Sequence, residues 1–179
     1  MKRLLLLLAG MTLLPGTLMV LAQDPPKRPM AIAALDPLLG TFEGDVTMMQ
    51  DGKSIKGRAQ HNNSGISSGW GFLMEEDITM EDGSKYTSHN IIGYDAGGKK
   101  VHVFSVTNAG ETHDHKGVWK DAKTITLEYD GTWEGKPYVE KAVLTIDGRD
   151  SYTLTWKATR AGQIVSSGEE KLRRVGGSY

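Results

Sequence analysis

The sequence predicts an all-β fold, an up-and-down antiparallel barrel of about ten strands. After Gly40, short runs rich in Thr, Val, Ile, Tyr and Trp alternate with turn signals. Asp-Gly and Gly-Gly pairs recur in these turns, which is typical of β-hairpins. No run keeps a helical period and no repeat of fixed length appears. Sequential hairpins without long crossovers favour closure into a barrel, because closure removes the exposed sheet edges.

The first 22 residues have the features of a secretory signal peptide. A basic start precedes an apolar run that Pro15 and Gly16 interrupt, and the segment ends in Val-Leu-Ala before Gln23. We expect cleavage after Ala22 and a periplasmic or secreted protein with no membrane association. A retained membrane anchor is the alternative, which the interrupted apolar run disfavours.

The remaining chain is long enough for one domain with its own core. The sequence holds 21 Lys and Arg against 22 Asp and Glu, so no excess of positive charge suggests nucleic-acid binding. It has no cysteine, which excludes thiol catalysis, disulfides and thiolate metal sites. We expect a signal peptide at 1–22, a Pro-rich linker at 23–34, a barrel domain at 35–175 and a tail at 176–179. The sequence does not indicate an oligomeric state.

The elements of the barrel follow in order from the linker. The stretch ALDPLLG, residues 34–40, predicts one or two helical turns that begin near Pro37 and end at Gly40. The segment 64–70 predicts a bend between the second and third strands. Turns between strands are predicted at QDGK (50–53), EDGS (81–84), DAGGK (95–99), NAGE (108–111), KDAK (120–123), DGTWEGKP (130–137), DGRD (147–150) and RAGQ (160–163).

Two stretches resemble known barrel families. LDPLLGTFEGDV (35–46) is similar to the L-x-G-x-W-x-G motif at the start of nitrobindin-like and calycin-like barrels, with Phe42 where Trp is usual. The region 69–106 resembles a family of secreted bacterial proteins that carry a domain of unknown function. Its G-x-x-L-x-E-E strand, its G-Y-D before a turn and its following aromatic strand carry the likeness. The resemblance covers residues 35–174 and implies a calycin-like or lipocalin-like barrel, without an established reaction.

Three two-residue turns, at Asp82-Gly83, Gly97-Gly98 and Ala109-Gly110, are assumed to set the register of four strands. These turns predict that Glu76 lies opposite His89 and that Val106 lies opposite His113. Because side chains alternate along a strand, one face then carries Trp70, Phe72, Met74, Glu76, His89, Ile91, His102, Phe104, Val106, His113, His115 and Trp119. This face holds the aromatic residues, so we assign it to the lumen.

A lumen of this composition predicts a binding site for a small, partly apolar ligand. The residues expected to contact its apolar part are Trp70, Phe72, Met74, Phe104 and Trp119. The residues expected to orient its polar atoms are Glu76, His89, His102, His113 and His115. A structural barrel with a filled interior is an alternative.

A metal protein or an enzyme is the other alternative. His102, His113 and His115 are candidate ligands of a divalent metal ion, with Glu76 as a fourth ligand or as an orienting partner. Imidazole and carboxylate could also act as an acid and base pair near neutral pH. Haem is disfavoured: nitrobindin-like barrels hold haem through a late histidine, whereas the last histidine here is His115.

Overall fold

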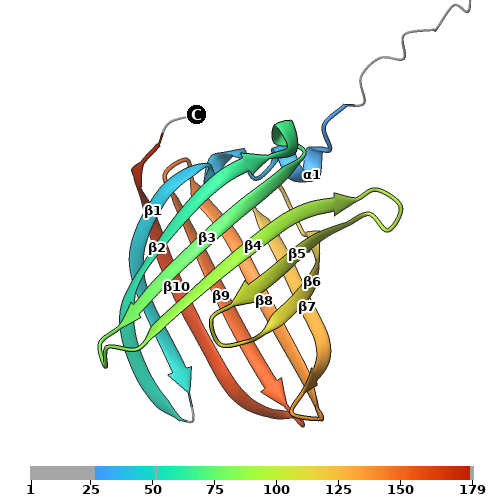
Figure 1. The fold of residues 1–179 in the computed structure, drawn as a ribbon. Coiled ribbons are helices and arrows are strands. Elements are labelled where there is room, and N and C mark those ends of the chain that lie inside the picture. Colours follow the sequence, from blue (N-terminus) through green and yellow to red (C-terminus); the bar gives the residue numbers. More distant parts are fainter. Residues whose placement is uncertain (1–26, 51, 178–179) are drawn as a thin grey trace, which may run out of the picture.

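The chain forms a single closed barrel of ten antiparallel strands (Figure 1). The computed structural model describes residues 27–50 and 52–177. Each strand pairs with its neighbours in sequence, and the last strand pairs with the first to close the sheet. The predicted fold class is therefore confirmed, including the up-and-down order and the short helical segment before the first strand.

The strands range in length from 8 residues in β5 and β6 to 14 residues in β2 and β10. Two short helical elements, α1 (Met30–Ala33) and the 3-10 helix η1 (Asp36–Leu38), precede them, and a second 3-10 helix, η2 (Ser67–Gly69), joins two strands. The strands are β1 (Gly40–Gln50), β2 (Lys53–Ile66), β3 (Gly71–Met80), β4 (Lys85–Asp95), β5 (Lys100–Thr107), β6 (Thr112–Trp119), β7 (Thr124–Trp133), β8 (Lys136–Gly148), β9 (Ser151–Arg160) and β10 (Gln163–Gly176).

The barrel has two unlike ends. The capped end carries α1 and η1 together with the turns that follow the even-numbered strands. The uncapped end carries the five hairpin turns that follow the odd-numbered strands, and neither α1 nor η1 lies there (Figure 1). Side chains alternate between solvent and interior along each strand, as period two requires.

An apolar core fills the capped end. Ile32 and Leu38 from the helical segment are fully buried against it, and so are Phe42, Phe72 and Tyr152 from the strands. Their packing excludes water from this half of the barrel.

Polar contacts fasten the helical segment to the strands. The indole nitrogen of Trp119 donates a hydrogen bond to the carbonyl of Ala31 at 3.0 Å, and Asn63 donates to the carbonyl of Leu38 at 2.9 Å. The segment 23–34, predicted as a linker, thus contains a helical turn in its described part, because Ile32 buries its side chain in the core. The predicted signal peptide lies outside the described residues. No helix in the described ranges is long and apolar enough to span a bilayer.

Two hairpin loops differ from the prediction by one residue each. The β3–β4 loop has three residues, since Thr79 pairs with Lys85, and its third residue, Gly83, has φ +85°. The β5–β6 loop is built in the same way around Gly110, which has φ +79°. A loop longer by one residue reverses the face of every later side chain.

The two differences cancel beyond the second loop. The predicted β4–β5 register is confirmed, with Gly93 opposite His102. Because β4 and β5 follow only the first extra residue, they are turned over relative to the prediction. The strand β6 follows both extra residues, so its predicted face is correct.

Candidate functional site

The structure divides the ten predicted site residues into three groups. Six of them point into the barrel: Phe72, Met74, Glu76, His113, His115 and Trp119. Three of them, His89, His102 and Phe104, point outward from the two strands that are turned over. Trp70 follows η2 at the capped end and is exposed. The ten residues therefore do not line one wall of the lumen as predicted.

The three outward side chains lie in solvated surroundings. The His89 Nε2 atom is 3.2 Å from Glu75 Oε1, and the His102 Nδ1 atom is 3.0 Å from Asp114 Oδ1. The ring of Phe104 is 44% exposed on the outer wall. His102 cannot share a metal ion with His113 and His115, because the wall of the barrel separates them.

The inward apolar residues also differ from the predicted pocket. Phe72, Met74 and Trp119 pack in the core of the capped end, under the helical segment. Phe72 has no exposed surface. These residues belong to the core of the capped end, and Trp119 is only partly buried.

Three titratable side chains meet in the buried middle of the barrel, and we call them the central triad: His61, Glu76 and Glu170. His61 on β2 lies directly opposite Glu76 on β3, and Glu170 comes from β10 on the far side of β1. The His61 Nε2 atom is 2.9 Å from Glu170 Oε2 and 3.5 Å from Glu76 Oε1. The side chains of His61 and Glu170 are 0% and 1% exposed.

Hydrogen bonds hold the outer atoms of the triad. The Tyr152 hydroxyl oxygen lies 2.6 Å from His61 Nδ1. The Ser88 hydroxyl donates to Glu76 Oε2 at 2.6 Å, and Ser88 in turn accepts a hydrogen bond from Asn90 at 2.7 Å. Ser105 extends this chain by donating to Asn90 Oδ1 at 2.6 Å. A polar layer thus crosses an otherwise apolar interior.

The triad holds protons more tightly than free side chains do. Burial alone would lower the pKa of His61, but the close carboxylates of Glu170 and Glu76 raise it to about 10. Burial and the neighbouring charge of Glu76 raise the pKa of Glu170 to about 7. Burial opposes ionisation of Glu76 as well, yet contact with protonated His61 lowers its pKa overall. Near neutral pH the triad therefore holds an imidazolium, a carboxylate and one partly protonated carboxyl group.

A second set of titratable side chains lies toward the uncapped end, and we call it the mouth cluster: His113, His115 and Glu140. Both histidines come from β6 and Glu140 comes from β8. The His115 Nε2 atom is 3.3 Å from Glu140 Oε1, and the His113 Nδ1 atom is 3.8 Å from Glu140 Oε2. The side chains of His113, His115 and Glu140 are 11%, 8% and 20% exposed, so solvent reaches this cluster.

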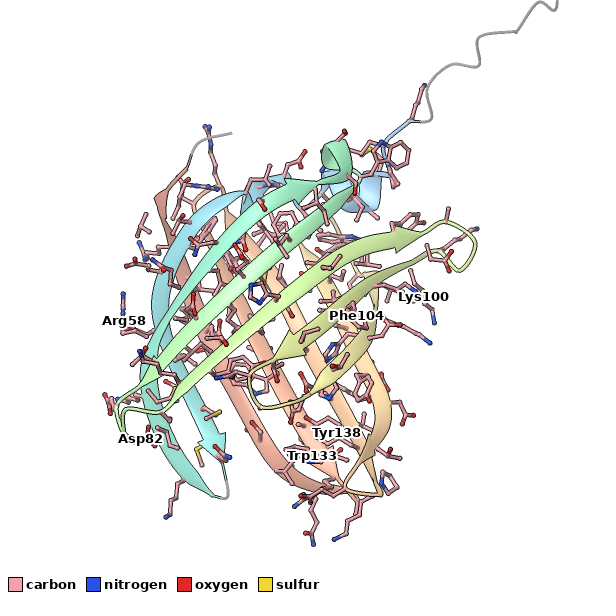
Figure 2. All side chains as sticks on the ribbon, in the orientation of Figure 1. Arg58, Asp82, Lys100, Phe104, Trp133 and Tyr138 are labelled. Carbon is pink, nitrogen blue, oxygen red and sulfur yellow. The ribbon has the colours of Figure 1, made fainter. Side chains whose placement is uncertain are left out.

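Aromatic rings form the wall beside the mouth cluster. The imidazole of His113 stacks on Tyr129, with centroids 4.1 Å apart and planes inclined by 16°. Tyr138 donates a hydrogen bond to Glu140 Oε2 at 3.0 Å, and its ring meets Trp133 edge to face at 5.2 Å. Figure 2 shows Trp133 and Tyr138 close together toward the uncapped end.

The charges of the mouth cluster are set by burial and contact. Burial lowers the pKa of His113 below its ordinary value, so its imidazole is neutral at pH 7. Burial opposes ionisation of Glu140, but the close contact with His115 and the hydrogen bond from Tyr138 lower its pKa overall, so it is a carboxylate. Burial, with the charge of Glu140, raises the pKa of Glu111 nearby.

Tyr86 connects the two sets of titratable groups. Burial raises its pKa, and the charges of Glu76, Glu140 and Glu111 raise it further. Its hydroxyl is therefore within electrostatic reach of the central triad and of the mouth cluster. In chemical terms, each cluster offers nitrogen and oxygen donors in the numbers that divalent metals use, and the mouth also offers flat aromatic surface.

Sequence reasoning missed His61, Glu140 and Glu170. A signal for His61 was present: an Asp-Gly turn of two residues between the first two strands matches the observed pairing of Gln50 with Lys53 and of Phe42 with His61. A signal for Glu170 was also present, because Glu170 and Leu172 alternate with Lys171 and Arg173. Glu140 gave no such signal on its own.

Comparison with known proteins assigns the fold and nothing finer. No family model matches the chain, and neither does any curated protein. Among solved structures, the S-type phycobiliprotein lyase CPES from Guillardia theta superposes with a TM-score of 0.58 at 7% identity, over 83% of this chain and 94% of the lyase. A redesigned β barrel matches with a TM-score of 0.40 at 15% identity, over 79% and 95% of the two chains. The likeness to the lyase supports the barrel fold alone, and membership of a secreted bacterial family stays a prediction.

Proposed function

We propose that this protein is a small-molecule-binding barrel whose binding site is the uncapped end, built around the mouth cluster. The observation that carries the proposal is the contrast in exposure along the interior. Ile32, Phe42 and Phe72 near the cap are fully buried. By contrast, partial contact with solvent is retained by His113, Glu140, Tyr129 and Trp133. A concave aromatic wall with a few convergent polar groups is the usual composition of a ligand site.

The groups at the mouth define the chemistry of the ligand. The partly exposed rings of Tyr129 and Trp133 offer flat surfaces on which an aromatic or conjugated ring can stack. The Glu140 carboxylate accepts hydrogen bonds, and Tyr138 holds it in place. We infer a small, flat ligand that carries a hydrogen-bond donor or a positive charge directed at Glu140.

The likeness to a phycobiliprotein lyase is compatible with a ligand-binding barrel but gives no ligand. The signal-peptide features of residues 1–22 support a periplasmic or secreted location, which we propose with the function. The sequence also allowed a structural barrel with a filled interior. We propose that this alternative applies to the capped half of the barrel and not to the mouth.

A fragment experiment tests this proposal. Ligand-observed NMR would be used to screen flat aromatic amines and amidines against the purified protein, with the corresponding aromatic carboxylates as a comparison. We expect the cationic set to bind, and we expect Glu140→Gln or Tyr129→Leu to weaken binding about tenfold, equivalent to about 1.4 kcal/mol. The matched control is Phe104→Leu on the outer wall, which should not change binding.

Two results would contradict the proposal. One is the absence of binding by any fragment of the panel. The other is binding that survives both Glu140→Gln and Tyr129→Leu, because the site would then lie elsewhere on the protein.

A further inference from the structure

We propose that the central triad of His61, Glu76 and Glu170 is a binding site for a first-row divalent metal ion of the zinc type. The site is separate from the mouth cluster, and the inference does not depend on the ligand proposed there. One nitrogen and two carboxylate oxygens, on three strands, form its donor set. Mixed nitrogen and oxygen donors suit zinc and its first-row neighbours.

The distances within the triad match a metal coordination sphere. Bonds of about 2.0–2.2 Å in a tetrahedral arrangement put two ligand atoms about 3.3 Å apart. The His61 Nε2 atom lies 2.9 Å from Glu170 Oε2 and 3.5 Å from Glu76 Oε1, on either side of that value. All three donor atoms lie within 4.8 Å of one another. The two distances from His61 therefore differ from the tetrahedral value by only a few tenths of an ångström.

The orientation of the donor atoms is the second observation. His61 Nε2 and Glu170 Oε2 are both buried and close together, yet among the described residues neither has a partner with the geometry of a hydrogen bond. Buried polar atoms are paired in nearly all native proteins, so each such case needs an explanation. Two donor atoms that approach without pointing at each other are the arrangement expected when both face a common third point.

The charge of the triad favours a divalent cation. Two ionised carboxylates and a neutral imidazole carry a charge of −2, and isolated buried charge is strongly unfavourable. A divalent ion balances this charge. In the absence of a metal ion, protons on the triad balance this charge instead.

The neighbours of the triad orient its donors toward the proposed ion. Tyr152 occupies His61 Nδ1, which leaves Nε2 as the nitrogen that faces the two carboxylates. Ser88 occupies Glu76 Oε2, which leaves Oε1 as the oxygen that faces His61. Hydrogen bonds of this kind to the remote atoms of metal ligands fix their orientation in known sites.

The mouth cluster is the weaker candidate for the same ion. Glu140 is held there by Tyr138, and His113 is engaged in stacking on Tyr129. It has one carboxylate where the triad has two, and it is open to solvent. It therefore provides both the internal control and the main rival in any measurement.

Cobalt and zinc titrations test the proposal. The untagged protein, freed of metal with a chelator, would be titrated with Co²⁺ while its visible absorption is recorded, and Zn²⁺ would then compete. We expect one ion per chain and protons released on binding, since the ion displaces the proton of His61. Affinity should rise with pH for the same reason.

Matched carboxylate variants locate the site. Loss of a residue that only orients a metal ligand weakens metal binding by roughly 10- to 100-fold. Glu170→Gln and Glu76→Gln each remove a ligand and should weaken Co²⁺ binding by more than this. Glu140→Gln should leave it unchanged. Circular dichroism would check the fold of each variant. If Glu170→Gln does not fold, Tyr152→Phe keeps all three donors and should weaken binding about tenfold or more.

Three outcomes would overturn the inference. The first is an unmodified protein that binds neither Co²⁺ nor Zn²⁺ at micromolar concentrations. The second is binding lost in Glu140→Gln but retained in Glu170→Gln, which would assign the ion to the mouth cluster. The third is binding retained in every one of these variants, which would assign it to neither.

Discussion

The two ends of the barrel interior use the same strands for opposite purposes. At the capped end, Phe42 and Tyr152 meet edge to face at 5.0 Å beneath the helical segment, and both rings are fully buried. At the uncapped end, the titratable side chains of His113 and Glu140 and the ring of Tyr129 stay partly exposed. Because the core of the capped half stabilises the fold, the uncapped half can hold polar and aromatic side chains that are suited to binding. Aromatic content alone does not tell the two halves apart.

The largest effect we expect separates an inward from an outward phenylalanine. Phe72→Ala removes a fully buried ring from the core and should lower the free energy of unfolding by about 3–5 kcal/mol. Phe104→Ala removes a ring that is 44% exposed and should cost about 1 kcal/mol or less. Urea denaturation of both variants measures the difference. Equal losses would mean that the register of β5 is wrong.

The pH dependence of stability distinguishes the triad from the mouth. The pKa of His61 rises from 6.5 to about 10 on folding, so its stabilising contribution is complete below pH 6.5 and is lost as the pH rises through 10. The pKa of Glu170 rises from 4.5 to about 7, so its contribution is complete below pH 4.5 and is lost as the pH rises through 7. The lowered pKa of Glu76 acts oppositely, and its contribution is lost only as the pH falls below its ordinary range.

Metal-free protein should therefore become less stable between pH 5 and pH 9. The slope has an upper limit of about 1.4 kcal/mol per pH unit for each proton. Glu170→Gln should flatten the part below pH 7, and Glu140→Gln should not. Urea unfolding in chelator at several pH values gives the slopes. A stability that rises steadily over this range would refute the proton balance of the triad.

A smaller difference is expected between two tyrosine hydroxyls. Tyr152→Phe leaves a buried His61 nitrogen without its partner and should cost about 1–3 kcal/mol. Tyr138→Phe removes a hydrogen bond to Glu140, which water can reach, and should cost about 0.5–1 kcal/mol. Denaturation midpoints with unchanged slopes would establish both values. A larger loss for Tyr138→Phe would show that the mouth is more tightly built than its exposure indicates.

The smallest effects belong to the outer wall. His89→Ala and His102→Ala each remove an exposed ion-pair partner and should change stability by about 0.5 kcal/mol or less. Cobalt binding should not change in either variant. Loss of the metal in His102→Ala would instead favour the ligand set predicted from the sequence.

The sequence was sufficient for the barrel because its strands and turns repeat a simple pattern. It was insufficient for the site because one extra residue in a loop decides whether the side chains of the next strand point inward or outward. The pairs Asp82-Gly83 and Ala109-Gly110 are compatible with a two-residue loop and with a three-residue loop. Both loop types use a glycine with positive φ, as Gly83 and Gly110 have. His113 and His115 were placed on the correct face only because two deviations cancelled. The central triad joins β2, β3 and β10, and their proximity follows from closure of the barrel, which local patterns do not report.

The pairing of β1 with β10 also has a kinetic consequence. It joins residues 41–50 to residues 166–176, the greatest separation along the chain of any strand pair in the barrel. Contacts this distant in sequence form slowly, because the chain entropy lost in closing so long a loop is not offset until the strands zip together. His61 and Glu170 lie on opposite sides of this seam. A barrel with nine ladders formed and the seam open would already look native by its backbone, yet its histidine and its glutamate would still be apart. The triad is therefore complete only once this seam has closed.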